Sequence, residues 1–308
     1  MAEISMLESF AKFFGSLAEK ARPLLPRRFR SDIPVVPVVR LSGVIGFSSP
    51  LRPGLSLAAV ARPLERAFAV RNAAAVALLI NSPGGSPVQS HLIYRRIRQL
   101  AEEKKRQVIA FVEDVGASGG YMVACAADEI ICDMSSILGS IGVVGGSFGF
   151  PKLMDRLGIE RRLYTAGEHK ATLDPFLPEN PEDVERLKTL QSEIHQGFID
   201  LVKQSRGERL KGAEKTLFSG EYWSGNKAIE LGLADSIGDL RSVLRKRFGE
   251  KVVMPLIGGE RSFFGRTRPG LGLDLRAFGL DPATSVADLA AGVISALEER
   301  ALWARYGL

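Results

Sequence analysis

Two apolar segments, each ended by a glycine-rich turn, are the feature that most constrains the fold of this chain. Residues 73–80 (AAAVALLI) lead into the turn Asn81 to Gly85, and residues 108–112 lead towards the turn Gly116 to Gly120. An apolar run that does not alternate with polar residues fits a strand buried on both faces, as in parallel sheets. The two segments therefore predict strands of one parallel sheet.

Segments with helical periodicity alternate with these runs. Residues 56–70, 88–104 and 118–127 have helical spacing or length, and residues 34–45 and 129–132 have the composition of strands. This alternation is typical of βαβ units, in which right-handed crossovers place helices on both faces of a sheet. The first half of the chain therefore predicts an α/β fold.

The rest of the chain divides into a continuation of this body and two distinct ends. Between residues 150 and 250 the pattern predicts a helix over 151–157, a strand over Arg161–Thr165, a loop with Lys170, a helix from Pro181 to about Gln204 and a helix within 220–238. We expect residues 32–250 to form the main domain. Residues 1–31 predict an amphipathic helix with a basic linker, and residues 251–308 predict a linker and an amphipathic helix.

The charge of the chain and its distribution limit the classes of partner that it is expected to bind. The formal net charge is +6, with a pI near 9.4, and arginines cluster near both ends. No alternation of basic and aromatic residues indicates an RNA-binding module, so we expect no nucleic-acid partner. The apolar stripe and basic run of residues 4–30 fit two alternatives equally well: peripheral contact with an anionic membrane, or packing against a partner subunit or the protein body.

Targeting and redox signals are sparse. Charged residues interrupt the apolar positions near the start, and no stretch approaches the roughly 18 apolar residues that span a bilayer, so we expect neither a signal peptide nor a transmembrane helix. The two cysteines, Cys125 and Cys132, give neither a zinc spacing nor a disulfide framework. We expect both to be buried, reduced thiols.

Ser118 is the best candidate for a nucleophile. It lies in the second glycine-rich turn, where a strand gives way to a helix, and ligands of open α/β sheets bind beyond the carboxyl ends of the strands. The unpaired N–H groups at a helix N-terminus suit a developing oxyanion. Phosphate binding is disfavoured because neither GxxxxGK[ST] nor GxGxxG occurs. A serine that merely caps the helix is an equally weighted alternative.

A serine hydroxyl needs a base, and the chain offers few. His91 and His195 fall within predicted helices, where surface or packing roles are more usual, whereas His169 is adjacent to Lys170 in a loop. A lysine amine accepts a proton only when uncharged, which requires removal of water or a nearby cation. An exposed lysine with no such role is the commonest alternative.

Four motifs together resemble the signal peptide peptidase A family of Ser–Lys serine peptidases. They are SPGG at 82–85, GASGGYMVACAADEI from residue 116, GSIGV at 139–143 and AGEHKATLDPF at 166–176, and the order and spacing agree over residues 34–240. The chain looks like the short form of the family, with one copy of the domain.

The resemblance implies a fold, a mechanism and an assembly. The fold would be a crotonase-like, Clp-protease-like α/β superhelix of ββα units. Ser118 would be the nucleophile, Lys170 the general base and Ser140 a hydrogen-bond partner of the lysine amine, while the N–H groups of Gly85 and Gly119 would form the oxyanion hole. In this family the dyad can be shared between neighbouring copies in a ring, so we expect a homo-oligomer. Neither a metal nor an organic cofactor would be required.

The substrates implied are short or unfolded peptides, with signal-peptide remnants or membrane-associated polypeptides among them. The family has a membrane anchor where this chain has the amphipathic helix of residues 4–25, so we expect the bacterial cytoplasm or the surface of the inner membrane. Three other readings share the fold: a crotonase-type acyl-CoA enzyme, a Clp-type protease with His169 as base, and a catalytically idle scaffold that binds peptides or membrane.

Overall fold

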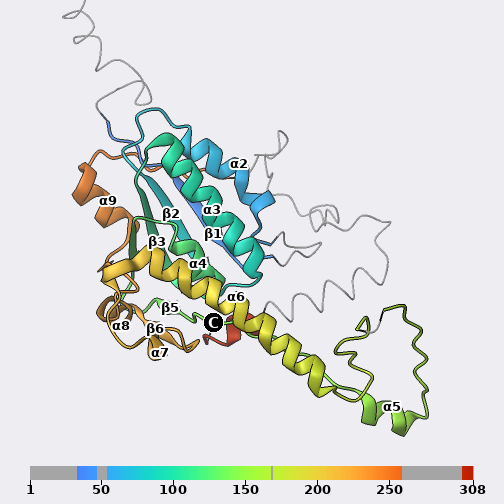
Figure 1. Ribbon diagram of the computed structural model, residues 1–308. Coiled ribbons are helices and arrows are strands. Elements are labelled where there is room, and N and C mark those ends of the chain that lie inside the picture. The colour runs from blue at the N-terminus through green and yellow to red at the C-terminus, as the bar shows by residue number, and fades with distance from the viewer. Residues whose placement is uncertain (1–32, 47–53, 168, 259–299, 308) are drawn as a thin grey trace, which may run out of the picture.

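The computed structural model describes residues 33–46, 54–167, 169–258 and 300–307, and shows a mostly parallel sheet covered by helices (Figure 1). The sheet has seven strands in the order β1-β2-β3-β4-β7, with β5 paired to β3 and β6 paired to β5. The strands are β1 (Val38–Ser42), β2 (Val76–Ser82), β3 (Val108–Ala117), β4 (Glu129–Cys132), β5 (Ile137–Gly139), β6 (Tyr222–Ser224) and β7 (Ser236–Ile237). All pairings are parallel except that of β5 with β6. The expected α/β fold is therefore confirmed.

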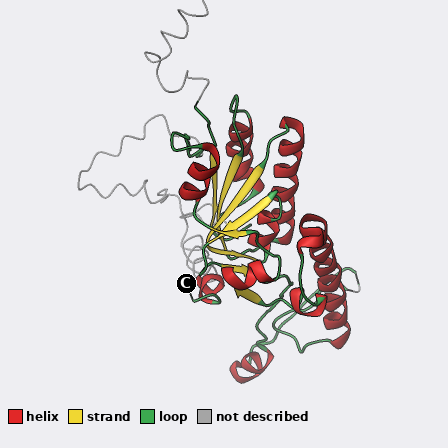
Figure 2. Ribbon diagram, turned by 90° about the vertical axis from the view of Figure 1, so that its left-hand side faces the viewer, coloured by secondary structure: helices red, strands yellow, loops and turns green. Residues whose placement is uncertain are grey.

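Helices lie on both sides of the sheet (Figure 2), and alternate residues of the central strands contribute to two hydrophobic cores, one on each face. In β3, Val108 and Ala110 belong to the larger core, while Ile109 and Phe111 belong to the smaller one. Both faces are apolar, which explains why the strand sequences show no polar alternation. The larger core is covered by α2 (Leu57–Phe68), α3 (Pro87–Lys104), α4 (Gly119–Ala124) and α6 (Pro181–Arg206), and the smaller one by α9 (Leu240–Phe248).

The helices begin at residues whose side chains or ring geometry favour a helix start. The hydroxyl oxygens of Ser56 and Ser86 accept hydrogen bonds from backbone N–H groups three residues later, at the starts of α2 and α3. The side-chain oxygen of Asn180 caps α6 by accepting from the N–H of Glu182, two residues later. A proline occupies the first helical position of α3 and α6, where its missing N–H costs nothing. These signals explain why the expected helix limits agree closely with the observed ones.

A buried ion pair joins the end of α6 to the sheet. The guanidinium of Arg206, which is 1% exposed, donates from both terminal nitrogens to Asp235 at 2.8 Å and from Nε to the carbonyl of Gly232 at 2.9 Å. Asp235 also accepts from the backbone N–H of Ile130, the second residue of β4, at 2.7 Å. Burial opposes the charge of Asp235, but the hydrogen bonds from Arg206 and Ile130 outweigh it and lower the pKa of the carboxyl.

Residues 143–178 and the first turns of α6 form an arm that extends away from the sheet (Figure 1). The arm contains α5 (Pro151–Leu157), but the strand expected over Arg161–Thr165 is wrong: residues 159–165 adopt no regular structure. A strand needs a neighbour to satisfy its backbone groups, and the described residues provide none at that position. The arm is instead held together by side chains, such as the ion pair of Arg161 with Asp174 at 2.7 Å.

Two segments beyond residue 250 pack on the body. Residues 252–257 run beside the start of the sheet, with hydrogen bonds of 2.9 Å from Val36 to Val253 and from Val38 to Pro255. Because of this pairing, the folded main domain extends beyond residue 250, its expected limit. Residues 300–307 lie against the end of β3, whereas the rest of the predicted C-terminal helix and the N-terminal helix of residues 1–31 fall outside the described residues. Within the described ranges, no helix is both long and apolar enough to span a bilayer.

Candidate active site

Ser118 occupies a strained turn between β3 and α4. Its backbone angles are φ 52° and ψ −122°, a conformation that non-glycine residues rarely adopt. Ser118 is the residue before the first turn of α4, yet its side chain makes no capping hydrogen bond. The turn is held by hydrogen bonds from Ser118 N–H to Gly139 O at 2.8 Å and from Met122 N–H to Ser118 O at 3.0 Å. The hydroxyl is therefore not engaged as a helix cap, which was the structural alternative to a nucleophile.

The two glycine-rich turns lie in direct contact, as expected for turns at the same edge of a parallel sheet. A Cβ atom added to Gly84 would come within 2.8 Å of both the backbone nitrogen of Gly119 and the Cβ atom of Ser118. A Cβ atom on Gly119 would in turn overlap the hydroxyl of Ser90, which is buried in α3. Only residues without side chains can bring these two backbones so close.

Gly85 and Gly119 each contribute backbone to this junction. Gly85 has φ 140° and bridges to Ile45, and an added Cβ atom would overlap the carbonyl oxygen of Ile45. Gly119 is the first residue of α4, where the helix itself supplies no acceptor for the N–H group. The junction thus combines a strained serine, a helix N-terminus and glycines whose backbone packs directly against its neighbours.

Ser140 reaches the same place from β5. Ala117 and Gly139 are partners in the β3–β5 register, so Ser118 and Ser140 each follow directly after a paired residue. Ser140 has φ 51°, is 7% exposed, and is fixed by a hydrogen bond from its N–H to Glu221 O at 2.6 Å. The preceding Gly139 faces the indole ring of Trp223, which leaves no room for a side chain. The structure therefore brings Ser118 and Ser140 together.

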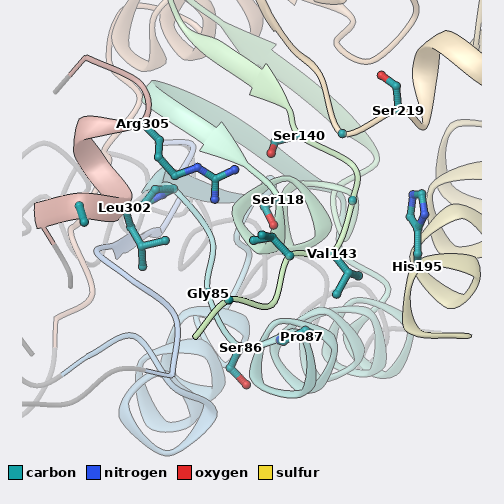
Figure 3. Close-up of a pocket in the computed structure, with 16 residues that line it drawn as sticks. Gly85, Ser86, Pro87, Ser118, Ser140, Val143, His195, Ser219, Leu302 and Arg305 are labelled. Atoms are coloured by element: carbon teal, nitrogen blue, oxygen red, sulfur yellow. The ribbon is translucent and has the colours of Figure 1, made fainter. Parts of the chain in front are cut away.

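A cavity of about 740 Å³ opens in front of the two serines (Figure 3). Its wall is formed by the glycine turn at Gly85, by the segment after Ser140, by the face of α6 at His195, by Ser219 and Gly220, and by residues 301, 302 and 305. Both polar and apolar surface line it. A cavity of this size accommodates a few residues of an extended peptide or a small molecule.

Lys170 does not line this cavity. It lies in an exposed turn of the arm, with a backbone hydrogen bond of 3.2 Å from its N–H to Gly167 O. His169 lines a second cavity in the arm, and its ring nitrogens lie 2.8 and 3.3 Å from the guanidinium nitrogens of Arg186. Neither proposed base is therefore placed beside Ser118 of the same chain.

Two cavity residues were not singled out by the sequence. His195 lies across the cavity from Ser118, and its Nε2 atom is 3.0 Å from the carbonyl oxygen of Ile141, so this nitrogen carries a proton. Arg305 enters from the other side of the cavity (Figure 3). His195 had the periodicity of an ordinary helix residue, and Arg305 belongs to a segment without any recognisable motif, so no local signal could have found either. Among the described residues, no cluster of three or more His, Cys, Asp or Glu side chains could hold a metal ion.

Comparison with known proteins shows what this chain is similar to. Over 287 residues, 92% of this chain, a protein of Brucella abortus named Na(+)/H(+) antiporter NhaA is 58% identical, and the match covers 38% of that protein. A putative protease of Methanocaldococcus jannaschii is 36% identical over 56% of this chain and 54% of its own length. The chloroplastic serine protease SPPA of Arabidopsis thaliana is 32% identical over 67% of this chain and 31% of its own length.

The chain thus spans between 31% and 54% of the length of these relatives. The model of peptidase family S49 matches residues 100–252. The matched region contains the strained turn at Ser118, the turn at Ser140 and the loop with Lys170. With proteases among its relatives and these three motifs inside the matched region, residues 100–252 of the chain belong to peptidase family S49.

Proposed function

We propose that this protein is a serine endopeptidase in which Ser118 is the nucleophile. The observation that carries the proposal is the turn itself: a non-glycine residue held at φ 52° and ψ −122°, with its hydroxyl free of capping, at the wall of a cavity. Strain of this kind costs of order 1–3 kcal/mol and persists where the surrounding structure fixes it, most often at functional sites. A serine that served only as a helix cap would not need a strained backbone conformation.

The N–H groups of Gly85 and Gly119 are proposed as the oxyanion hole. Their turns are in contact, Gly85 lines the same cavity as Ser118, and Gly119 directly follows Ser118 at the start of α4. An N–H group at the start of α4 also benefits from the positive end of the helix. Donors aimed at the developing oxyanion are worth on the order of 3 kcal/mol each to the transition state.

Lys170 is proposed as the general base, supplied by a neighbouring copy of the chain. In one copy it lies on the projecting arm and outside the cavity of Ser118. Most of the exposed large apolar side chains of the described residues lie on this arm and the first half of α6, with Tyr164 90% and Phe148 80% exposed. Packing of such an arm on the next copy would bury these side chains and remove water from the amine. Ser140 would then accept a hydrogen bond from the amine and hold it beside Ser118.

The reaction follows from these positions. Ser118 Oγ attacks the peptide carbonyl carbon while Lys170 Nζ takes the hydroxyl proton, which gives a tetrahedral intermediate with its oxyanion on Gly85 and Gly119. Collapse breaks the C–N bond, and the lysine returns the proton to the leaving amine. Lys170 Nζ then takes a proton from a water molecule that attacks the ester carbon. The bond to Ser118 Oγ breaks, the acid product leaves and Ser118 takes the proton back from the lysine. Short or unfolded peptides are the expected substrates, because an extended chain is needed to lie along the cavity.

Three alternatives are separated from this proposal by single observations. A Clp-type protease would use His169, whose ring nitrogens face Arg186 in another cavity. A crotonase-type acyl-CoA enzyme would need the pair of N–H groups but no strained serine. A catalytically idle scaffold would require neither the pair of N–H groups nor the strained serine. The name of the Brucella relative concerns a protein of which this chain matches 38%, and the peptidase proposal is argued from the site instead.

Labelling with a fluorophosphonate probe tests the proposal, followed by mass spectrometry of the labelled peptide. We expect labelling at Ser118, its loss in Ser118→Ala, and its strong reduction in Lys170→Ala but not in His169→Ala. Two matched controls are Ser219→Ala, a cavity serine whose hydroxyl donates to Thr216 O at 2.8 Å, and Lys152→Ala, another lysine of the arm. Labelling that survives Lys170→Ala and disappears in His169→Ala would contradict the Ser–Lys assignment. Absence of labelling together with acyl-CoA binding would favour the crotonase reading.

We also propose that the protein works in the bacterial cytoplasm or at the surface of the inner membrane, which residues 4–30 would contact. The support is the apolar stripe followed by a basic run in the sequence. Cell fractionation of the full chain and of a variant without residues 1–25 measures whether this segment is needed for sedimentation with the membrane. The shorter variant is expected in the soluble fraction, and equal sedimentation of both would rule out a membrane contact through this segment.

A further inference from the structure

Residues 300–307 are anchored on the strand that ends at Ser118. Trp303 and Tyr306 pack against Val115 and Ala117 of β3, together with Ile137 of β5. Tyr306 is 8% exposed, and its ring stands edge-on to that of Tyr222 at a centroid distance of 5.1 Å.

The anchor fixes the backbone at Arg305. The hydroxyl of Tyr222 donates to the carbonyl of Arg305 at 3.3 Å, so the residue is held from β6 as well as through its neighbour Tyr306. Its side chain extends from this fixed point into the cavity, on the side of Ser118 and Ser140 (Figure 3). The position of the Arg305 backbone, from which the side chain enters the cavity, therefore follows from packing.

The described residues that line the cavity carry a positive charge but no negative one. Among the described residues that line it, Arg305 is the only permanent charge, and no Asp or Glu is present. No ion pair of Arg305 with a described carboxylate is found either. A guanidinium without a carboxylate partner, at the mouth of a site for a peptide, offers two parallel N–H donors to an incoming carboxylate.

We propose that Arg305 is a specificity-determining residue that selects peptides with a carboxylate close to the scissile bond. This rests on the proposed function of Ser118. The carboxylate can belong to an Asp or Glu side chain or to the end of a short peptide, because both present the same planar pair of oxygens. A charge pair that is partly open to solvent changes affinity by a factor of about 3 to 10, and the preference decreases as salt is added.

Binding to an inactive variant tests this without requiring turnover. In the Ser118→Ala background, fluorescence anisotropy would compare labelled peptides of one sequence with Glu, Gln or Lys beside the central bond, each capped at both ends. A fourth peptide, with Gln and a free C-terminal carboxylate, separates the two sources of the charge. We expect the Glu peptide or the free-carboxylate peptide to bind about 3- to 10-fold tighter than the capped Gln peptide.

Variants of Arg305 then assign the preference. Arg305→Gln should abolish it, Arg305→Glu should turn it towards the Lys peptide, and Arg305→Lys should keep part of it. Arg300→Gln is the matched control, since Arg300 is exposed on the same segment and does not line the cavity. Thermal unfolding of each variant shows whether the segment and body remain folded.

The outcomes distinguish this inference from the proposed function. Equal affinities for all peptides, or a preference that survives Arg305→Gln, would overturn the role of Arg305. Uniformly tighter binding of all four peptides by a variant without residues 300–307 would also overturn it, since the segment would then obstruct rather than select. Cleavage of the Gln peptide by the wild type without an acidic preference would leave the peptidase standing. An acidic preference in binding without any cleavage would support Arg305 and remove the peptidase.

Discussion

At the scale of single residues, the site is defined by backbone positions that side chains would block or strain. Ser118 adopts a conformation suited to glycine, and Gly84, Gly85 and Gly119 lie where added Cβ atoms would meet backbone or buried side chains. The cost of the strained serine is met by its hydrogen bonds to β5 and within α4. The backbone strain at Ser118 therefore lowers the stability of the folded protein, while the surrounding hydrogen bonds keep the geometry of the turn.

Replacing Ser118 by glycine should raise stability while removing the proposed nucleophile. Glycine adopts φ 52° and ψ −122° without a Cβ clash, so we expect Ser118→Gly to increase the free energy of unfolding by about 1 kcal/mol. Ser118→Ala is the control, because it removes the hydroxyl but keeps the Cβ atom and hence the strain. Urea unfolding of both variants measures the difference. Equal stability of the two would show that the turn stores no strain.

The sequence predicted those residues that belong to local motifs and missed those that depend on packing. Ser118 and the two glycine turns could be located because each turn follows an apolar strand, and strand ends of a parallel sheet meet at one edge. Ser140 was found only through the GSIGV motif of the family that the chain resembles. Arg305 reaches the cavity only because Trp303 and Tyr306 dock on β3 from the far end of the chain. No spacing near Arg305 encodes that contact.

At the scale of elements, helix limits were predictable and strand pairing was less so. The limits of α3 and α6 agree with expectation because caps and first-turn prolines are local. The expected strand over Arg161–Thr165 failed because composition cannot say whether a partner strand is present. β6 and β7, of three and two residues, were not expected, since such short segments carry no periodicity and depend on their pairing with β5 and β4.

The connection between α6 and the sheet depends on Asp235. Removing its charge would leave the buried Arg206 guanidinium without its carboxylate, so we expect Asp235→Asn to lower the free energy of unfolding by about 3 kcal/mol. The pKa of Asp235 is lowered in the folded protein, so its contribution is present above the pKa of the unfolded chain, near 3.9, and is lost as the pH falls through the folded value.

The measurement is chemical unfolding at several pH values. Between pH 7 and pH 3 the wild type should lose stability more steeply than Asp235→Asn, because the variant lacks this titrating group. Asp155→Asn, on the exposed arm, is the control and should follow the wild type. Parallel pH profiles of the wild type and Asp235→Asn would contradict a linkage through this carboxyl.

At the scale of the whole molecule, the body and the arm have opposite characters. The body has two hydrophobic cores and buries both cysteines, where burial raises the pKa of the Cys125 thiol to about 11 and that of Cys132 to about 12. The arm instead exposes apolar side chains such as Tyr164, Phe148 and Leu157. This contrast supports the proposal that the arm meets another copy and delivers Lys170 to it.

Mixing two inactive variants tests that proposal. Ser118→Ala and Lys170→Ala should each be inactive alone, while copies assembled together by refolding should regain activity at about a quarter of the sites, as for random neighbours in a ring. Cleavage of a capped peptide by the mixture measures the recovery. The same mixture carrying Tyr164→Glu and Leu157→Glu in both chains is the control and should neither assemble nor recover. Activity absent from the assembled mixture would place nucleophile and base in the same copy.

The separation of Ser118 from the arm that carries Lys170 has a consequence for when such a chain becomes active. If a working site requires two copies, its abundance rises more steeply than the amount of protein, and dilution removes it. Newly synthesised chains would then be inactive while they are scarce, and this inactivity would not require an inhibitor or a propeptide. Hydrolysis would begin only where copies accumulate, so the local concentration of the protein would itself be the activating signal.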